Sequence, residues 1–228
     1  MVVGGIAGLI LLAAGGAAWL LLNSHTAPAP LALGSPTPAG TAAGGFAGNW
    51  KVGTGSTAGY RVREKFVNQS SETEAVARTT TITGGLVIAS TGSTFQASSL
   101  HFTADLSALV SQDRYSVFQA YQRDFFVRTI YLMTDQFPNA DFTAASVTLP
   151  AGIQSGPVSF SVTGILTVHG ETKPVTTMVH VQLTGEQVEV VGSINVDMRD
   201  FNISPPDISF TKAEPAVVIE YRLLLVRA

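Results

Sequence analysis

The sequence predicts a mainly β protein: an antiparallel sheet of about eight strands with a short helical insert, preceded by one N-terminal transmembrane helix. Three observations lead to this prediction. Apolar and polar residues alternate with a period of two through most of residues 49–228, which is typical of antiparallel strands with one apolar face. One middle segment changes to helical spacing, and the chain starts with an uncharged apolar run. The alternation fits either a closed barrel or a two-sheet sandwich.

The N-terminal run is long enough to cross a bilayer. Residues 2–22 carry no charge, and Trp19 lies near the end of the run, where an aromatic ring favours the membrane interface. A helix of this length spans about 30 Å, the thickness of the hydrocarbon core. We therefore expect residues 1–22 to be a single-pass anchor in the cell membrane, with the C-terminal domain outside the cytoplasm. The alternative is a signal peptide that is cleaved to give a secreted protein, although such apolar regions are usually about 7–15 residues long.

A linker is expected to follow the anchor. Residues 23–48 consist almost entirely of Pro, Ala, Gly, Ser and Thr, a composition that predicts a semi-extended tether. The first charged residue of the chain is Lys51. With 13 basic and 16 acidic residues, the chain has no basic stripe for nucleic acid, and the absence of cysteine excludes disulfides and thiolate chemistry.

Residues 49–228 are expected to form one β domain. Its alternating segments place Val, Phe, Leu and Tyr on one face of each strand, with Ser, Thr or charged residues on the other. Turn signals such as Thr184-Gly185 separate the segments. The clearest alternation is found in residues 59–66, 98–106, 158–168, 175–183, 187–198 and 216–226.

The segment between residues 111 and 142 breaks the alternation. Ser111 can cap a helix whose first turn holds Asp113, and Pro138 marks the point before which the helix must end. We expect one or two short helices here, which close one end of the β structure. The residues at helical spacing are Tyr115, Phe118, Gln122, Phe125 and Thr129.

The stretch LTVHGETKPVT, residues 166–176, concentrates polar groups but is predicted to be a hairpin. Alternation makes Val168 the end of one strand and Val175 the start of the next. Residues 169–174 would then connect them, with Gly170 free to adopt positive φ and Pro174 at the first position of the second strand.

No motif for a nucleophile, a phosphate loop or a metal site is present, so we expect no catalytic residue, no metal and no cofactor. Three histidines lie on polar strand faces with no spacing that makes them converge, and three carboxylates are expected to be solvated. These residues are His101, His169, His180, Glu189, Asp197 and Asp200.

Four segments in the same order resemble the YceI-like family. They are YRVRE at 60–64, QRDFFVRTIYLMTDQFPNADF at 122–142, VTGILTVHGETKPVT at 162–176 and GSINVDMRDFNI at 192–203. The resemblance covers about residues 49–228. It implies a lipocalin-like antiparallel barrel whose elongated apolar interior holds a long polyisoprenoid or similar lipid, and it implies no catalytic mechanism. Many members are secreted by a cleaved signal, so the anchor and linker depart from the pattern.

The function predicted from the residues and the resemblance is that of a membrane-tethered extracytoplasmic protein that sequesters or carries an isoprenoid-like lipid. The ligand would be a polyprenyl quinone or polyprenyl phosphate, and the sequence is compatible with a homodimer. Arg123 is a candidate contact for the lipid head group, with fixation of the helical insert as its alternative role. Two other functions stay open: a β-sandwich interaction module without a small ligand, and a surface hydrolase. The expected lining residues are Phe66, Phe102, Phe125, Phe142, Phe160, Val162, Leu166, Val179, Ile194 and Tyr221.

Overall fold

The computed structural model describes residues 27–35, 45–67, 71–113, 117–209 and 211–228. The expected transmembrane span, residues 1–22, lies outside the described residues. Within the described part of the chain, no helix is both long enough and apolar enough to cross a membrane.

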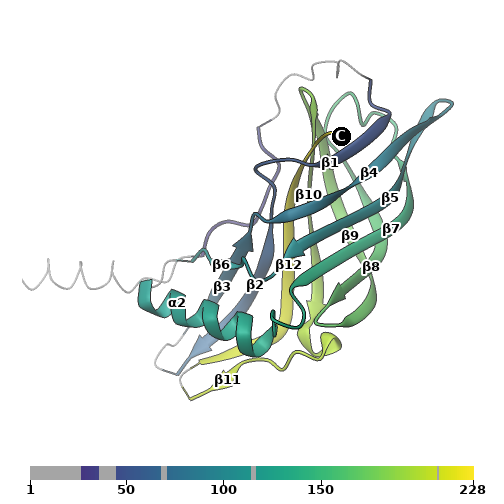
Figure 1. Cartoon of the computed structure of the whole chain (residues 1–228). Helices are drawn as coiled ribbons and strands as arrows, with labels where there is room; N and C mark the ends of the chain where they lie inside the picture. The colour runs from purple at the N-terminus through teal and green to yellow at the C-terminus, as the bar shows by residue number, and fades with distance from the viewer. Residues whose placement is uncertain (1–26, 36–44, 68–70, 114–116, 210) are drawn as a thin grey trace, which may run out of the picture.

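Eight strands form a closed antiparallel barrel (Figure 1). The last strand pairs with the first, from Trp50 opposite Arg227 to Val52 opposite Leu225, and this pairing closes the ring. Closure removes the free edges that a two-sheet sandwich would keep, so the barrel is the correct one of the two predicted architectures. In order around the ring, the strands are β1 (Gly48–Val52), β4 (Ile82–Thr91), β5 (Thr94–Asp105), β7 (Asn139–Leu149), β8 (Val158–Val168), β9 (Glu171–Thr184), β10 (Gln187–Asp197) and β12 (Thr211–Arg227).

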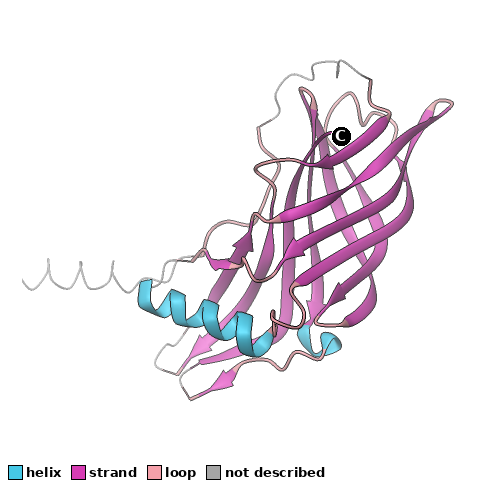
Figure 2. Cartoon of the chain, viewed as in Figure 1, coloured by secondary structure: helices cyan, strands magenta, loops and turns pink. Residues whose placement is uncertain are grey.

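Within the described residues, four further strands and three helical segments accompany the ring. Figure 2 shows how they are arranged. Strand β12 is long enough to pair with β1 near its C-terminal end and with β2 over the rest, so β2, β3 and β6 extend the sheet beside the ring. We call the end with the β4–β5 and β9–β10 hairpins the upper end, and the end with the β8–β9 hairpin the lower end. The additional elements are β2 (Thr57–Phe66), β3 (Thr73–Thr79), β6 (Val110–Ser111), β11 (Asp207–Ile208), α2 (Val117–Phe126), the π-helical η1 (Val127–Tyr131) and the 3-10 turn η2 (Met198–Phe201).

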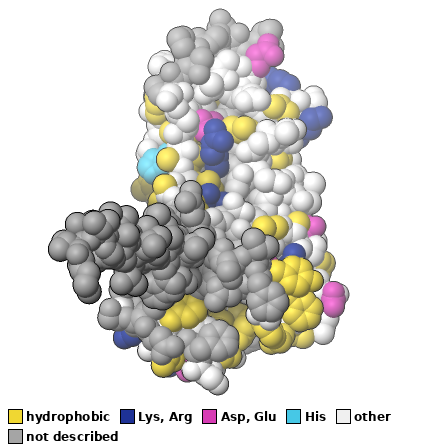
Figure 3. Space-filling model, turned by 90° about the vertical axis from the view of Figure 1, so that its left-hand side faces the viewer, with side chains coloured by type: hydrophobic (Ala, Val, Ile, Leu, Met, Phe, Trp, Pro, Cys, Tyr) yellow, Lys and Arg dark blue, Asp and Glu magenta, His cyan; other side chains and the backbone are white. Residues whose placement is uncertain are grey.

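The helical insert is confirmed, but its predicted cap is wrong. The described helix begins at Val117, and Ser111 lies in β6 instead. There, the backbone N–H and the hydroxyl of Ser111 both donate to the Asp124 carboxylate, which fastens α2 to the sheet. Helix α2 runs across the lower end of the barrel, and hydrophobic side chains gather at this end on one face of the molecule (Figures 1 and 3).

The β8–β9 hairpin is tighter than predicted. The turn consists of His169 and Gly170 alone, with φ of 52° and 78°. A two-residue turn with two positive φ angles matches the twist of the flanking strands, and histidine tolerates this region better than most residues. Pro174 is therefore inside β9, opposite Ile165. It fits there because the β9–β10 register ends at Met178, so the side of Pro174 that lacks an N–H has no strand to pair with.

Residues 27–35, which we call the strap, lie along the outer wall of the barrel rather than hanging free. The Leu31 N–H donates to the Glu220 carboxylate over 3.4 Å, and the Gly34 N–H donates to Glu189 over 3.0 Å. Both carboxylates are nearly inaccessible to solvent. The composition of this stretch predicted a tether, and it gave no sign that the strap docks on the wall.

Two arginines hold the N-terminal half of the strap. Arg61 donates to the Pro28 carbonyl and Arg78 to the Ala29 carbonyl, each over 2.8 Å. The same two arginines form ion pairs with Glu220, at 3.5 Å and 2.7 Å. Burying such charges is costly unless they are paired and hydrogen-bonded, and here the strap supplies part of that pairing.

The expectation that Glu189 is solvated is wrong. Only 3% of the residue is exposed, because the strap covers it. Burial alone would raise the pKa of Glu189, but hydrogen bonds from Gln182, Gly34 and Arg222 hold this pKa below its ordinary value. Gln182 also donates to the Gly34 carbonyl over 3.1 Å, so the carboxylate belongs to the attachment of the strap.

Candidate binding cavity

The barrel encloses two adjoining cavities, an upper one of about 160 Å³ and a lower one of about 170 Å³. Four residues line both of them: Ala58 from β2, Ala104 from β5, Ala140 from β7 and Ile219 from β12. Ala104 and Ala140 stand directly opposite each other in the β5–β7 register. Three of these four side chains are a single methyl group, which leaves a narrow waist between the cavities.

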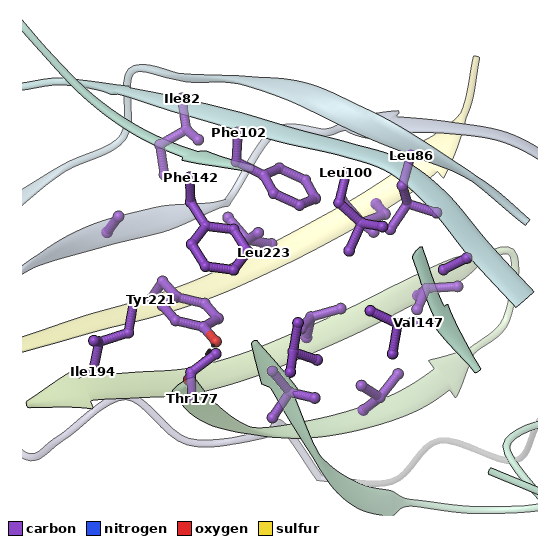
Figure 4. A pocket seen from close by; sticks show the side chains of 18 of the residues that line it. Ile82, Leu86, Leu100, Phe102, Phe142, Val147, Thr177, Ile194, Tyr221 and Leu223 are labelled. Atoms are coloured by element: carbon purple, nitrogen blue, oxygen red, sulfur yellow. Dashed lines mark hydrogen bonds between the residues drawn. The ribbon is translucent and has the colours of Figure 1, made fainter. Parts of the chain in front are cut away.

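Eight of the ten lining residues expected from the sequence border the upper cavity. Alternation places them there, because every second residue of a barrel strand faces inward. Figure 4 shows several of these side chains converging from different strands. The eight are Phe102, Phe142, Phe160, Val162, Leu166, Val179, Ile194 and Tyr221.

Several inward-facing residues are only partly buried. Phe102, Phe142 and Tyr221 point into the barrel, yet they keep accessible surface because they border empty space (Figure 4). By contrast, Trp50 at the upper end is fully buried and does not border the cavity. The barrel is therefore hollow in its middle and solid near its upper end, whereas a well-packed core has few voids larger than a water molecule.

The polar groups at the cavity wall satisfy each other. The Thr177 hydroxyl donates to the Ser193 carbonyl over 2.9 Å, and its oxygen lies 2.8 Å from the Tyr221 hydroxyl (Figure 4). Burial raises the pKa of Tyr221 to about 12, and the bond to Thr177 offsets this only in part. Tyr221 is therefore neutral at physiological pH. The described lining contains no Lys, Arg or His. Its one carboxylate, that of Asp141, accepts a hydrogen bond from the Thr103 hydroxyl.

The upper end is plugged by the residues that precede β1. Phe46 is 3% exposed, packs edge-on against Phe95 and lines the top of the upper cavity. The Trp50 indole N–H donates to the Phe46 carbonyl over 3.1 Å. Arg227 stacks over the Trp50 ring and donates to the Ala47 carbonyl, which fixes the plug to the end of β12. Among the residues that the structure describes, Phe46 and its partners thus plug the upper end.

Helical segments cover the lower cavity. Val127, Tyr131 and Leu132, in and just after η1, contribute to its wall, and Phe201 and Pro206 enter from the opposite side. Helical segments, rather than strands, therefore close the lower cavity.

A model of the YceI-like domain matches residues 52–224, which is nearly the whole barrel. The chain belongs to the YceI-like family. A polyisoprenoid binding domain from Saccharophagus degradans, implicated in plant cell wall breakdown, shares the fold with a TM-score of 0.55 at 14% identity, over 78% of this chain and 98% of that one. BcnA from Burkholderia cenocepacia matches with a TM-score of 0.52 at 19% identity, over 74% and 95%. None of the curated proteins compared with the chain matches it.

Two residues expected in the lining of this YceI-like barrel lie elsewhere. Phe66 is on the inward face of β2 but past the end of the lower cavity, opposite Thr211. Phe125 is 49% exposed on the outer face of α2. For Phe66, alternation predicted the correct face of the strand but not that the cavity ends before this residue. For Phe125, a period of two does not apply, because the residue lies in a helix.

The structure places Arg123 beneath α2, where other side chains occupy its donors. Its guanidinium binds Asp113 with two hydrogen bonds, of 2.8 Å and 2.5 Å, and Nε donates to the Ser111 hydroxyl over 3.1 Å. Glu64 lies 3.6 Å away. This bidentate geometry fixes the helical insert to β6 and favours the structural role of Arg123 over a head-group contact.

The remaining candidates of the sequence analysis are separated. His101 lies near Asp141, His180 binds Ser159, and His169 packs on the Phe137 ring. Among the residues that the structure describes, no three potential metal ligands come together.

Asp197 is the N-cap of η2, and Asp200 lies exposed within η2. Asp197 accepts hydrogen bonds from Arg199, and these lower the pKa of Asp197. The contact joins neighbours in one exposed turn, which is the ordinary environment of a solvated carboxylate.

The residues that give the cavity its shape were not predicted from the sequence. Alternation places the waist alanines on the inward faces of their strands. They were nevertheless not predicted as lining residues, because the prediction selected large apolar side chains. Tyr60 lines the lower cavity, and its burial raises the pKa of its hydroxyl well above the usual range. Phe46 precedes the predicted domain boundary and could not be found by alternation.

Proposed function

We propose that this YceI-like protein sequesters or carries a long-chain, isoprenoid-like lipid in its barrel. The single observation that carries the proposal is the pair of adjoining cavities that share an alanine-lined boundary, the waist. Together they run along the barrel axis, and their walls are almost wholly apolar. A compact ligand would need one wide chamber, whereas a thin chain needs a long narrow one.

The energetics favour such a chain. Burial of apolar groups gains about 0.8 kcal/mol per methylene, so ten buried methylenes would supply about 8 kcal/mol without any directed polar contact. Each cavity alone resembles in size an engineered cavity of about 150 Å³ that stays dry and binds benzene. The two together reach the lower end of the range for ligand pockets, about 300–1,000 Å³. The polyisoprenoid binding named for the S. degradans structure supports the same ligand class.

The described lining favours a neutral head group. A polyprenyl quinone carries no charge, so its ring could lie between the apolar walls without a counter-ion. A polyprenyl phosphate would find no cationic side chain among the described lining residues, so its phosphate would have to stay outside. Of the two candidate ligands, the quinone is the better fit.

For its location, we propose a single-pass anchor at residues 1–22 that holds the barrel outside the cytoplasm. The uncharged apolar run at residues 2–22 supports this proposal. Cleavage of this segment would instead release a secreted carrier. Mass measurement of the mature chain from a membrane fraction separates these two states.

Organic extraction of the purified full chain, followed by mass spectrometry, tests the ligand. We expect one long-chain prenyl lipid per chain, and uptake of added prenyl quinone by chain that has been stripped of lipid. Failure to recover such a lipid, together with failure to take up either prenyl quinone or prenyl phosphate, would reject the proposed function.

A further inference from the structure

An apolar stripe follows the outer face of the α2–η1 segment. It consists of Tyr121, Phe125, Phe126 and Ile130, whose exposed fractions are 68%, 49%, 46% and 55%. Figure 3 shows hydrophobic side chains gathered at this lower end of the barrel. Large apolar side chains that are exposed side by side usually mark an interaction surface.

The same segment is the wall of the lower cavity. Val127 and Tyr131 face the cavity, while Phe126 and Ile130, next to them in sequence, face outward. A single helical layer therefore separates the apolar stripe from the lower cavity. The layer changes from α- to π-helical geometry at Val127, and π-helical turns are frequent at functional sites.

The strap places the start of the described chain close to this stripe. Its Ala29 carbonyl is held by Arg78, and Arg78 pairs with Val110 of β6. The next residue of β6, Ser111, is bound to Asp124 of α2. The strap thus begins over the strands to which α2 is fastened, level with the waist of the barrel, because Arg78 and Glu220 both pair with Gly59, the neighbour of Ala58.

Only residues 23–26 separate the strap from the apolar run at residues 2–22. Even when fully extended, the steps from Leu22 to Ala27 cover at most roughly 18 Å. This step rests on the proposed function: it requires that the run is the membrane anchor. In that case the docked strap keeps the barrel close to the bilayer. The side of the barrel that carries α2 and its apolar stripe is then the side beside the bilayer.

We propose that the apolar stripe of α2–η1 docks into the bilayer interface, and that lipid passes there between the membrane and the lower cavity. Phe and Tyr suit this interface because their rings are apolar while the Tyr hydroxyl stays hydrated. Four side chains are few for a stable protein partner, which buries about 800 Å² on each side. In the described part of the chain, Phe46 plugs the upper end, whereas helical segments cover the lower end.

A single-cysteine experiment tests the docking, because the chain has no native cysteine. The full chain carrying Ile130→Cys is labelled with an environment-sensitive fluorophore and reconstituted into vesicles of phosphatidylethanolamine and phosphatidylglycerol. Glu186→Cys, in the exposed β9–β10 turn at the upper end, is the matched control. We expect doxyl-labelled lipid to quench the label at 130 and soluble iodide to quench the label at 186.

Equal iodide access at both positions, with no lipid quenching at 130, would overturn the proposal. Quenching between labels on different chains, rising with protein density, would do the same by showing that a second copy covers the stripe. Lipid recovered by extraction in either case leaves the proposed function intact, so the two proposals fail separately.

The double variant Phe125→Ser/Phe126→Ser tests lipid entry. We expect its rate of prenyl quinone uptake from vesicles to fall about tenfold or more, while the amount bound from dilute detergent solution stays the same. Both side chains are exposed, so the fold should tolerate the change. An unchanged uptake rate would refute the stripe as the entrance, and loss of binding from detergent would mean that the stripe helps to retain the ligand instead.

Discussion

Ala104→Leu should separate a hollow barrel with a continuous cavity from a barrel with two isolated voids. Ala104 lines both cavities and stands opposite Ala140 at the waist. Leucine adds three carbons at this point. Glycine positions are poor sites for such a test, because a Cβ at Gly164 would overlap the Phe142 ring and the Thr143 carbonyl.

The expected magnitude follows from the displaced volume. Three added carbons take the place of about three methylenes of a bound chain, which is worth about 2.4 kcal/mol or roughly 60-fold in Kd. The stability of the lipid-free protein should also distinguish a hollow waist from a packed one. Overpacking a filled core costs about 1–3 kcal/mol, whereas filling an existing void costs little. We therefore expect weak binding without a lower Tm in the lipid-free protein.

The assay is fluorescence titration with a prenyl quinone, together with thermal unfolding of lipid-free protein. Ala89→Leu, on the exposed outer face of β4, is the matched control and should leave Kd unchanged. A Tm drop in Ala104→Leu without any change in Kd would refute the reasoning, because it would show a packed waist that no ligand crosses.

Three further predictions concern named contacts. Arg123→Met should destabilise the protein by about 3–5 kcal/mol in chemical denaturation, because Asp113 would be buried without its partner; normal stability with lost lipid uptake would assign Arg123 to the ligand instead. The free energy of unfolding should fall as pH rises from about 10 to 12, because folding raises the pKa of Tyr221 above its ordinary value. Tyr221→Phe should reduce this loss in unfolding curves measured at several pH values. An unchanged loss would contradict this role of Tyr221. Hydrogen exchange at the Gly34 N–H should become faster only below about pH 4.5. There Glu189, whose pKa is lowered, becomes protonated and binds the strap less strongly. A pH-independent rate, after correction for intrinsic exchange, would count against this contact.

Alternation was a reliable guide to the strand faces. In β8, for example, Val162 and Leu166 are buried while Ser161 and Thr163 are exposed, because successive side chains of a strand point to opposite sides. The same period failed at Phe125, since a helix turns its side chains by about 100° per residue and several faces of α2 carry apolar groups.

The strap shows a different limit. Its attachment uses the backbone carbonyls of Pro28 and Ala29 and the N–H of Gly34, which every residue but proline offers in full. Nothing in the side chains of such a stretch indicates a partner. The partners of the strap are on the outer faces of the strands. Glu189 and Glu220 lie there, at positions that alternation assigns to solvent.

The sequence by itself determined the strands, their inward faces and the family, because these depend on the order of apolar and polar residues within a few positions. The tertiary structure alone decided that β1 pairs with β12, that three alanines from separate strands meet at one waist, and that the strap is fixed to the wall. Each of these contacts joins residues far apart in the chain. Their distances are set by how the sheet closes and twists, which no local pattern records.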